Sequence, residues 1–450
     1  MKKILLFLTF IILPINVLAE DITSSSNITI NNEKYNKLTD NKENTYISVE
    51  KNKVINIQNN KNISGIYIIY ELKSQTGIIK GNNKSLEIGT NGFLHEYIDL
   101  KDLGITNELE LKYNENVKIG EIYVLSEGDL PEYVEVWEEP CKEADLLLFT
   151  THSDDEQLFF LGLLPTYVAK GASVQVVYFA NHNDNPKRLH EQLHGLYTVG
   201  IRNYPVMGLI PDAYSESLNG AIKNIEKAGL SVEDATNFEI EMIRRFKPLV
   251  VVGHDEKGEY SHGQHILNTH VLKMALEKTN DKTIHPESYE KYGLWDVPKT
   301  YLHLYKENMI VMNYDEPLEY FGGKTAYEIS KEGYSKHLSQ QWTWFTKWIN
   351  GSNNNYTKAT DIKTYSPIEY GLYRTTVGED LNKNDMFENL KFRKDEIVEE
   401  DVENKIVINT TDESNEKYFS RYRNYIIIGT IFVLTLTIIV VSNKKNKVKK

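Results

Sequence analysis

Three continuous apolar runs, separated by helical patterns, constrain the fold of this chain most. The runs are ADLLLFTT, SVQVVYFAN and PLVVVG, at residues 144–151, 173–181 and 248–253. A strand that is covered on both faces loses the alternation of polar and apolar residues, so each run predicts such a strand. Helical patterns follow in between, at residues 157–171, 186–200 and 232–246. This order of strands and helices predicts right-handed βαβ units and a doubly wound α/β domain with a parallel sheet.

Polar residues with catalytic potential follow the first and third runs. FTTHSDDEQLFF, residues 149–160, places a histidine and three acids side by side, although neighbouring carboxylates repel and are costly to bury. GHDEKGEYSHGQH, residues 253–265, follows the third run. Ligands of such sheets bind at the carboxyl ends of the strands, so we expect the two segments to meet in one crevice. His254 comes directly after the third run, and we expect it to contact substrate there.

The histidines favour a metal site in this part of the chain. Eleven of the twelve lie between His152 and His337. His262 and His265 are three residues apart and can project to the same side of a helical turn. Two histidines and a carboxylate such as Asp155 form a ligand set for catalytic Zn²⁺ with one open position, although Fe²⁺ or Co²⁺ would also fit. The spacing alone leaves the choice open, because HxxD and HxxH also occur in exposed polar loops.

Several motifs in a fixed order carry a family resemblance. THSDDE, RLHEQLHGLYTVG, GEYSHGQH and YGLWDVPKTYLHLY occur in this order, and further similarity extends to about residue 390. Residues 144–390 thereby resemble the PIG-L/LmbE-like family of N-acetylglucosaminyl deacetylases. The resemblance implies a Rossmann-like sheet and a metal-dependent hydrolase that cleaves the acetamide of an N-acetylated amino sugar.

The resemblance also implies the metal ligands and the general base. His152 and Asp155 match the family's first two metal ligands, and His265 matches the third. Asp154 matches the general base that deprotonates the metal-bound water. Glu156 completes the motif without a catalytic step assigned to it.

Four further residues match groups that act on the substrate. His262 matches the histidine that supports the oxyanion and the leaving group, and Tyr260 matches a tyrosine that polarises the substrate carbonyl. Arg188 matches an arginine that contacts the sugar, and Glu191 follows it in the same helical motif. We therefore expect Arg188 and Glu191 to bind substrate.

The chain departs from the family pattern at two places. Ser153 stands where the family usually has proline, and Gly263-Gln264 stands where it often has Pro-Asp. None of these positions is a ligand, so we expect the metal site to be retained. The changes alter the loop backbone near the metal and put the details of substrate binding in doubt.

The part that precedes this domain has a different pattern. Residues 20–138 contain short runs with β-branched and aromatic residues, such as GIYIIYEL, ELELKY and VKIGEIYVL, bounded by asparagine and glycine. This pattern predicts an all-β sandwich. KLTDNKENTYISVEKNKVINI resembles the galactose-binding-like sandwich, which implies either glycan binding or a spacer.

The two ends of the chain predict export and a membrane anchor. Two lysines, an apolar run and a small-residue pattern at Val17 and Ala19 are typical of a secretory signal peptide at residues 1–19. A second apolar run predicts a transmembrane helix at residues 425–442, and the basic tail 443–450 is expected to remain cytoplasmic. The charged segment 393–424 is expected to be a stalk that connects this helix to the deacetylase domain, residues 139–392.

Composition excludes some classes of function. The net charge of −13 argues against nucleic acid as a main partner, and the single cysteine, Cys141, excludes an intramolecular disulfide. We expect a single-pass, cell-surface, zinc-dependent N-deacetylase whose partners are an N-acetylated glycan and the membrane. Three alternatives remain: an amidase acting on another N-acyl conjugate, a glycan-binding protein with a structural metal, and a non-haem iron oxygenase. Asp154, which neighbours the ligands, favours hydrolysis over the oxygenase.

Overall fold

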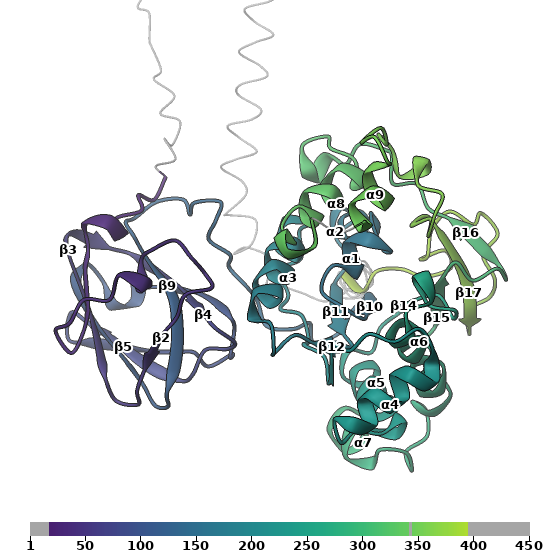
Figure 1. Cartoon of the computed structure of the whole chain (residues 1–450), viewed down its shortest axis with the longest axis horizontal. Helices are drawn as coiled ribbons and strands as arrows, with labels where there is room; N and C mark the ends of the chain where they lie inside the picture. Colours follow the sequence, from purple (N-terminus) through teal and green to yellow (C-terminus); the bar gives the residue numbers. More distant parts are fainter. Residues whose placement is uncertain (1–17, 342–343, 395–450) are drawn as a thin grey trace, which may run out of the picture. The chain divides into compact units, whose positions relative to one another are not determined.

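The computed structural model describes residues 18–341 and 344–394 (Figure 1). One compact unit ends at Phe392, and a second begins at Arg393. The helices and strands of the described residues all lie in the first unit. The boundary between the sandwich and the deacetylase domain at residues 138 and 139 stays a prediction.

The N-terminal part consists of two antiparallel sheets. The five-stranded sheet has the order β1 (Asn27–Ile30), β3 (Val54–Ile63), β8 (Thr106–Tyr113), β5 (Gly77–Gly81), β6 (Lys84–Ile88). The four-stranded sheet has the order β2 (Ile47–Val49), β9 (Val117–Leu125), β4 (Gly65–Tyr70), β7 (His95–Asp99). The region is therefore rich in sheet, as the sequence predicts.

Alternating apolar residues join these two sheets through one core. Ile55 and Ile57 of β3 are fully buried, and they share an apolar cluster with Ile66 and Ile68 of β4. Side chains two residues apart on a strand point to the same face, which explains why these pairs face the core together. The likeness to a galactose-binding-like sandwich stays a prediction.

A buried carboxyl group on β9 makes the stability of the sandwich depend on pH. Glu121 of β9 is fully buried; one of its oxygens accepts the N–H of Lys42 at 2.7 Å, and the other has no hydrogen-bond partner. Burial, and then the neighbouring Asp40 carboxyl group, raises the pKa of Glu121 to about 8. The folded state therefore binds more protons than the unfolded state between pH ~4.3 and that value, so stability falls as pH rises through this window.

Replacing Glu121 by glutamine is expected to flatten this pH dependence. At pH 8 to 9 the variant should be more stable by about 1–3 kcal/mol, since the buried charge with an unpaired oxygen is removed. Urea unfolding midpoints of both proteins, measured from about pH 5 to 9, test this. Glu87→Gln, at an exposed position of β6, is the matched control. Parallel pH profiles for Glu121→Gln and the wild type would contradict the prediction.

The C-terminal part is built on a six-stranded sheet. Its order is β11 (Val174–Tyr178), β10 (Leu146–Thr150), β14 (Val250–Gly253), β15 (Lys299–His303), β17 (Glu369–Thr375), β16 (Met309–Val311). The first four strands are parallel, whereas β17 runs antiparallel to both β15 and β16. The expectation of a wholly parallel sheet is therefore corrected to a mixed sheet with an antiparallel edge. The sequence of β17 is polar toward its end, where the strand pairs with β15 but no longer with β16.

Helices cover both faces of this sheet (Figure 1). The helices are α1 (Asp155–Leu158), α2 (Leu163–Ala169), α3 (Pro186–Thr198), α4 (Leu218–Lys227), α5 (Val232–Phe246), α6 (Gly263–Lys278), α7 (Pro286–Tyr292), α8 (Ala326–Tyr334) and α9 (Phe345–Asn350). Leu146 and Leu148 of β10 pack with residues of α2, α3 and α8, whereas Leu147 and Phe149 pack with residues of α5 and α6. The buried β10 strand thus lies between two apolar layers, which explains its continuous apolar run.

The predicted helices are present, with one interruption. The third coincides with α5, and the second contains α3. The first, residues 157–171, is divided into α1 and α2, because Gly162 has a left-handed φ of 87°. A side chain at this position would also meet the Tyr314 ring.

The strand order positions the candidate site. The chain leaves β10 to form β11 on one side and later returns to form β14 on the other side. The carboxyl end of β10 is therefore a topological switch point, where α/β sheets bind ligands. His152 and the acids that follow it lie at this point.

The predicted terminal segments lie almost wholly outside the part described. Residues 1–17 of the signal peptide, most of the stalk, the helix at 425–442 and the tail at 443–450 are not among the described residues. Within the described ranges, no helix has both the length and the apolar character needed to cross a bilayer.

Candidate metal centre and active site

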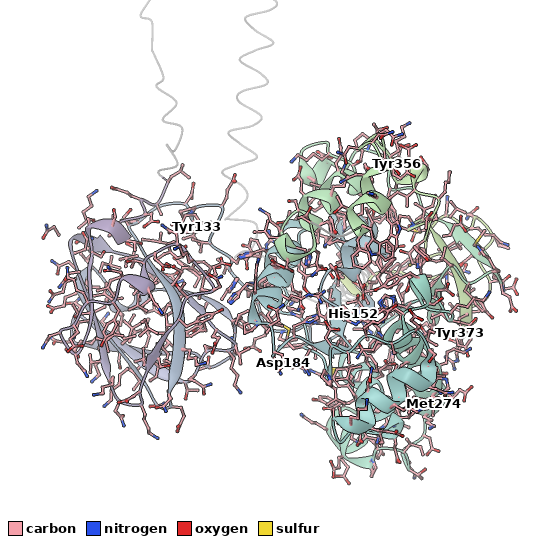
Figure 2. All side chains as sticks on the ribbon, viewed as in Figure 1. Tyr133, His152, Asp184, Met274, Tyr356 and Tyr373 are labelled. Atoms are coloured by element: carbon pink, nitrogen blue, oxygen red, sulfur yellow. The ribbon has the colours of Figure 1, made fainter. Side chains whose placement is uncertain are left out.

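The three predicted metal ligands lie together at the carboxyl end of the sheet. His152 (labelled in Figure 2) follows β10, Asp155 begins α1, and His265 lies in the first turn of α6. His152 Nδ1 is 3.1 Å from Asp155 Oδ2 and 3.2 Å from His265 Nε2, and this Nε2 is 3.1 Å from Asp155 Oδ2. All three side chains are buried.

These distances fit a metal ion. A tetrahedral Zn²⁺ with bonds of about 2.0–2.2 Å separates its ligand atoms by about 3.3–3.5 Å, close to the spacing observed. Two overlapping sets of described residues also bring ligand atoms within 4.8 Å: His152, His262 and His265; Asp155, His254 and His265. His254 Nε2 cannot serve, because it accepts the N–H of Thr151 at 3.0 Å.

Hydrogen bonds from neighbouring side chains orient the two histidine ligands. His265 donates from Nδ1 to Glu259 Oε2 at 2.7 Å, which leaves Nε2 free to coordinate. His152 donates from Nε2 to Gln264 Oε1 at 2.8 Å, which leaves Nδ1 free. Partners of this kind set the tautomer and the ring orientation of metal-binding histidines. Gln264, one of the departures from the family pattern, thus has a part in the site.

Glu259 is a central residue that the sequence analysis missed. It is fully buried, and besides His265 it accepts Nδ1–H bonds from His254 at 2.8 Å and from His303 at 2.6 Å. Burial alone would raise the pKa of Glu259, but the charge of His254 and the three hydrogen bonds hold it well below its usual range. Its position inside GEYSHGQH was the only available signal, since His303 comes from a different strand.

Replacing Glu259 by glutamine is expected to weaken metal binding by about 10- to 100-fold. The amide offers one acceptor oxygen to three histidine donors and cannot stabilise them by charge. Competition with a chelator of known affinity measures the change. Glu256→Gln is the matched control, because Glu256 lies in the same loop but pairs with Lys273. Unchanged affinity would show that Glu259 does not orient His265.

Asp154 is held in a strained conformation beside the ligands. Its φ is 121°, in a region where non-glycine residues are uncommon, and such outliers are concentrated at functional sites. Asp154 Oδ1 lies 3.2 Å from the Arg188 guanidinium, whereas Oδ2 is buried without a hydrogen-bond partner. Burial raises the pKa of Asp154 to about 7, against the opposing charge of Arg188. The free oxygen can accept a proton from a nearby group.

Arg188 of α3 is engaged by two carboxylates. Its Nη2 contacts Asp154, and its Nη1 lies 2.9 Å from Asp212 Oδ2. Asp212 was missed by the sequence analysis, because the strand that it follows, β13 (Ile210–Pro211), has only two residues. The arrangement makes Arg188 a positioning residue for Asp154. Its predicted contact with the sugar stays a prediction.

His262 and Tyr260 lie at the rim of the metal centre. His262 Nδ1 accepts the N–H of Gln264, so its Nε2 carries the proton and can donate to substrate. The His262 ring is 4.6 Å from that of His152 and 4.7 Å from that of His265. Tyr260 has a left-handed φ of 45° and its ring is 5.3 Å from the His262 ring. Burial raises the pKa of Tyr260, so its hydroxyl remains a donor.

Two of the predicted substrate-binding residues have their polar atoms engaged within the protein. Glu191 is buried and accepts hydrogen bonds from the N–H and the hydroxyl of Ser339. His254 is fully buried, with one ring nitrogen bound to Thr151 and the other to Glu259. In the structure both side chains hold neighbouring segments together. Their predicted contact with substrate stays a prediction.

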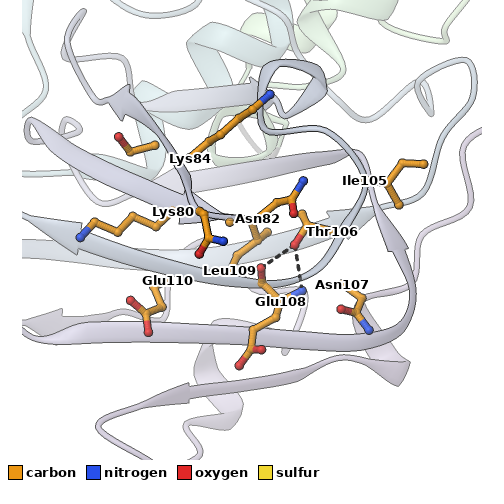
Figure 3. Close-up of a pocket in the computed structure, with 12 residues that line it drawn as sticks. Lys80, Asn82, Lys84, Ile105, Thr106, Asn107, Glu108, Leu109 and Glu110 are labelled. Atoms are coloured by element: carbon orange, nitrogen blue, oxygen red, sulfur yellow. Dashed lines mark hydrogen bonds between the residues drawn. The ribbon is translucent and has the colours of Figure 1, made fainter.

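A separate cavity of about 670 Å³ lies in the N-terminal sheets (Figure 3). Lys80, Asn82 and Lys84 line it from the hairpin of β5 and β6, and Glu108 and Glu110 line it from β8. Its lining contains no histidine and no cluster of metal ligands. The cavity is therefore separate from the centre at β10.

Comparison with known proteins agrees with the residues assembled here. The model of the family described as "PIG-L: GlcNAc-PI de-N-acetylase" matches residues 147–276. A 1D-myo-inositol 2-acetamido-2-deoxy-alpha-D-glucopyranoside deacetylase of Saccharopolyspora erythraea is 29% identical over 178 residues, which cover 34% of this chain and 63% of the relative. Its counterpart in Geodermatophilus obscurus is 27% identical, and the match covers 35% of this chain and 60% of the relative. The chain thus spans less than two thirds of the length of either relative.

Among solved structures, the N,N'-diacetylchitobiose deacetylase of Pyrococcus horikoshii matches 52% of this chain and 85% of its own, with 13% identity and a TM-score of 0.38. The matched family segment runs from β10 to α6 and contains all three metal-site residues together with Asp154. The chain therefore contains, at residues 147–276, a domain of the PIG-L family.

Proposed function

We propose that this chain is a metal-dependent N-deacetylase, which hydrolyses the acetamide of an N-acetylated amino sugar in a glycan or glycoconjugate. The observation that carries the proposal is the buried, unpartnered oxygen of Asp154 beside three ligand atoms at metal-binding distances. PIG-L family members and the named relatives are deacetylases, and their names support an acetamido sugar as the substrate class.

The protein's own residues supply the proton transfers. When bound to His152, Asp155 and His265, Zn²⁺ would lower the pKa of a water ligand and polarise the acetamide carbonyl. Asp154 accepts the proton of the attacking water at Oδ2, while Arg188 holds its other oxygen. The water oxygen bonds to the carbonyl carbon, the C–N bond breaks, and the proton passes to the leaving amine. Acetate and a free amino sugar result.

Hydrogen-bond donors at the rim stabilise the developing oxyanion. The Nε2–H of His262 and the hydroxyl of Tyr260 serve as donors in this proposal. His262 is already oriented by the backbone N–H of Gln264, so little reorganisation is needed during reaction. This preorganisation is what makes such donors effective in a buried site.

Aromatic side chains beside the centre favour a sugar as the substrate. Trp344 is 52% exposed, and its ring lies 5.7 Å from that of Tyr260 and 4.1 Å from that of Trp348. Exposed indole faces bury the apolar face of a sugar ring while its hydroxyl groups remain accessible. An aromatic surface next to the catalytic groups fits a glycan better than a small free amide.

The cellular location is part of the proposal. The signal peptide at residues 1–19 and the helix at 425–442 would hold the deacetylase domain on the outer surface, with the basic tail in the cytoplasm. Protease treatment of intact cells tests this. Digestion of the domain with protection of a short C-terminal fragment is expected, and a fully protected chain would overturn the topology.

The activity is tested with the full-length protein in detergent. Acetate release from oligosaccharides that contain N-acetylglucosamine is compared with release of bulkier acyl groups from the same sugars. The variant that carries both His152→Ala and His265→Ala is the control. Hydrolysis of the acetyl substrate by the wild type alone is expected. A preference for bulkier acyl groups would favour the amidase alternative, and no hydrolysis of any amide would reject the proposal.

A further inference from the structure

A second cluster of ionisable groups, three of them buried and two half-buried, lies outside the metal centre, between the N-terminal sheets and α3. Its members are His95 of β7, Glu135 of the segment that connects β9 to β10, His190 and His194 of α3, and Glu43, which precedes β2. His95 is the one histidine of this chain outside residues 152–337, and its side chain is fully buried. We call these five residues the histidine network.

Short hydrogen bonds link the members in a continuous chain. Glu135 uses one oxygen for His95 Nδ1, at 2.8 Å, and the other for His194 Nδ1, at 2.6 Å. His95 Nε2 lies 2.8 Å from His190 Nδ1. His194 Nε2 lies 3.0 Å from both oxygens of Glu43. Every ring nitrogen of His95 and His194 therefore has a partner.

One arrangement of protons satisfies all of these contacts. His194 donates from both nitrogens to carboxylates, so it must be an imidazolium, whereas His95 and His190 can each be neutral. Burial alone would lower the pKa of His194, but the charge of Glu135 and hydrogen bonds to Glu135 and Glu43 raise it to about 10. Tyr46 completes the chain by donating its hydroxyl to His190 Nε2 at 3.3 Å.

The distances favour hydrogen bonds over a second metal ion. Ligand atoms around a tetrahedral ion are about 3.3–3.5 Å apart, as they nearly are at His152, Asp155 and His265. In the network, the His95 and His194 nitrogens approach Glu135 to 2.8 and 2.6 Å, which are hydrogen-bond lengths. A bound ion would force these atoms apart and displace the proton between His194 and Glu135.

The histidine network contacts the side of α3 that faces away from Asp154, the proposed general base. Successive residues of an α-helix are rotated by about 100°, so Arg188 points roughly opposite to His190 and His194. Arg188 contacts Asp154 and Asp212 on that opposite side. One face of α3 is thus bound to the sandwich, and the other face holds the proposed general base.

We propose that the histidine network is a positioning device, through which the N-terminal sandwich fixes α3 and thereby sets Arg188 against Asp154. The sandwich is then part of the catalytic unit, which neither the spacer nor the glycan-binding interpretation requires. The kinetic test of this inference rests on the proposed deacetylase function. The structural test, which uses hydrogen exchange, does not.

A double-mutant cycle between His194 and Arg188 tests the coupling. In the full-length protein, His194→Ala is expected to lower kcat by about 10- to 100-fold, because a misplacement of about 1 Å has effects of this size. KM and metal content should change little. If His194 acts through Arg188, adding His194→Ala to Arg188→Ala should cause almost no further loss. Losses that multiply, or an unchanged kcat in the single variant, would overturn the inference.

A milder variant and a control keep the test decisive if His194→Ala fails to fold. Glu43→Gln removes one carboxylate partner at a partly exposed position, and a two- to fivefold loss of kcat is expected. His270→Ala is the matched control, because His270 is an exposed histidine of α6 outside the network. A loss of equal size in the control would reject a specific role for the network.

Hydrogen exchange separates this inference from the proposed function. Amides of α3 are expected to exchange faster in His194→Ala than in the wild type, whether or not any substrate is hydrolysed. Faster exchange in His194→Ala, together with a wild type that hydrolyses no substrate, would support the role of the network and reject the deacetylase function. Unchanged exchange would reject the network alone. Two metal ions per wild-type chain, falling to one in His194→Ala, would instead show that the cluster is a metal site.

Discussion

Replacing Asp154 by asparagine is expected to remove most turnover while the metal remains bound. The amide nearly matches the carboxylate in shape and keeps an oxygen for Arg188, so the strained loop should be retained. It cannot take a proton from water, because its oxygen is far less basic than a carboxylate. A loss of about 10²- to 10⁴-fold in kcat is expected for the removal of a general base.

Two measurements on this variant separate chemistry from structure. Metal content by mass spectrometry should match the wild type, since Asp154 is not a ligand in the observed arrangement. Acetate release should fall to near the background. Asp184→Asn, at an exposed position of the loop before α3 (Asp184 is labelled in Figure 2), is the matched control. Normal turnover by Asp154→Asn would refute the general-base assignment.

Removing the metal is expected to abolish activity and to destabilise the domain. Without an ion, the ligand atoms of Asp155 and the two histidines face one another in a buried site, 3.1–3.2 Å apart. An ion that binds only the folded state adds stability that grows with its concentration relative to Kd, about 2.7 kcal/mol at 100 times Kd. Chelation should therefore lower the melting temperature as well as the rate.

Reconstitution identifies the ion. The purified chain is expected to contain about one metal ion, and the variant with His152→Ala and His265→Ala should contain none. After chelation, Zn²⁺, Co²⁺ and Fe²⁺ are added separately to the apoprotein, and both acetate release and the melting temperature are followed. Recovery with Zn²⁺ supports the zinc proposal, and recovery with Fe²⁺ alone would reject it. Full activity after complete chelation would refute metal dependence altogether.

The local patterns of this chain predict its elements well where each element is decided by its own residues. The continuous apolar run of β10 and the amphipathic pattern of α5 are sufficient to predict these elements. A strand buried on both faces is apolar throughout, and a helix buried on one side has apolar residues at helical spacing. The contiguous THSDDE motif likewise predicts ligands that lie within a few residues of each other. His265 could be added because it follows another strand with the same carboxyl-end placement.

Other features depend on contacts between distant segments, and the sequence alone did not reveal them. The antiparallel edge of the sheet depends on how β17 returns beside β15, and no local pattern records that direction. Glu259 became important only because His254, His265 and His303 converge on it. The partners of His254 likewise come from other segments, since its ring nitrogens are bonded to Thr151 and Glu259, and its predicted contact with substrate stays a prediction.

The sequence by itself thus determined the α/β class, the order of its central elements and the candidate ligands, since these follow from periodicity and from short motifs. Only the tertiary structure decided which oxygen of Asp154 is free, which groups orient the ligands, and that His95 of the sandwich meets His190 and His194 of α3. The physical reason is the same in each case. A buried polar atom must find a partner, and the partner is chosen by proximity in space, which packing sets and spacing along the chain does not.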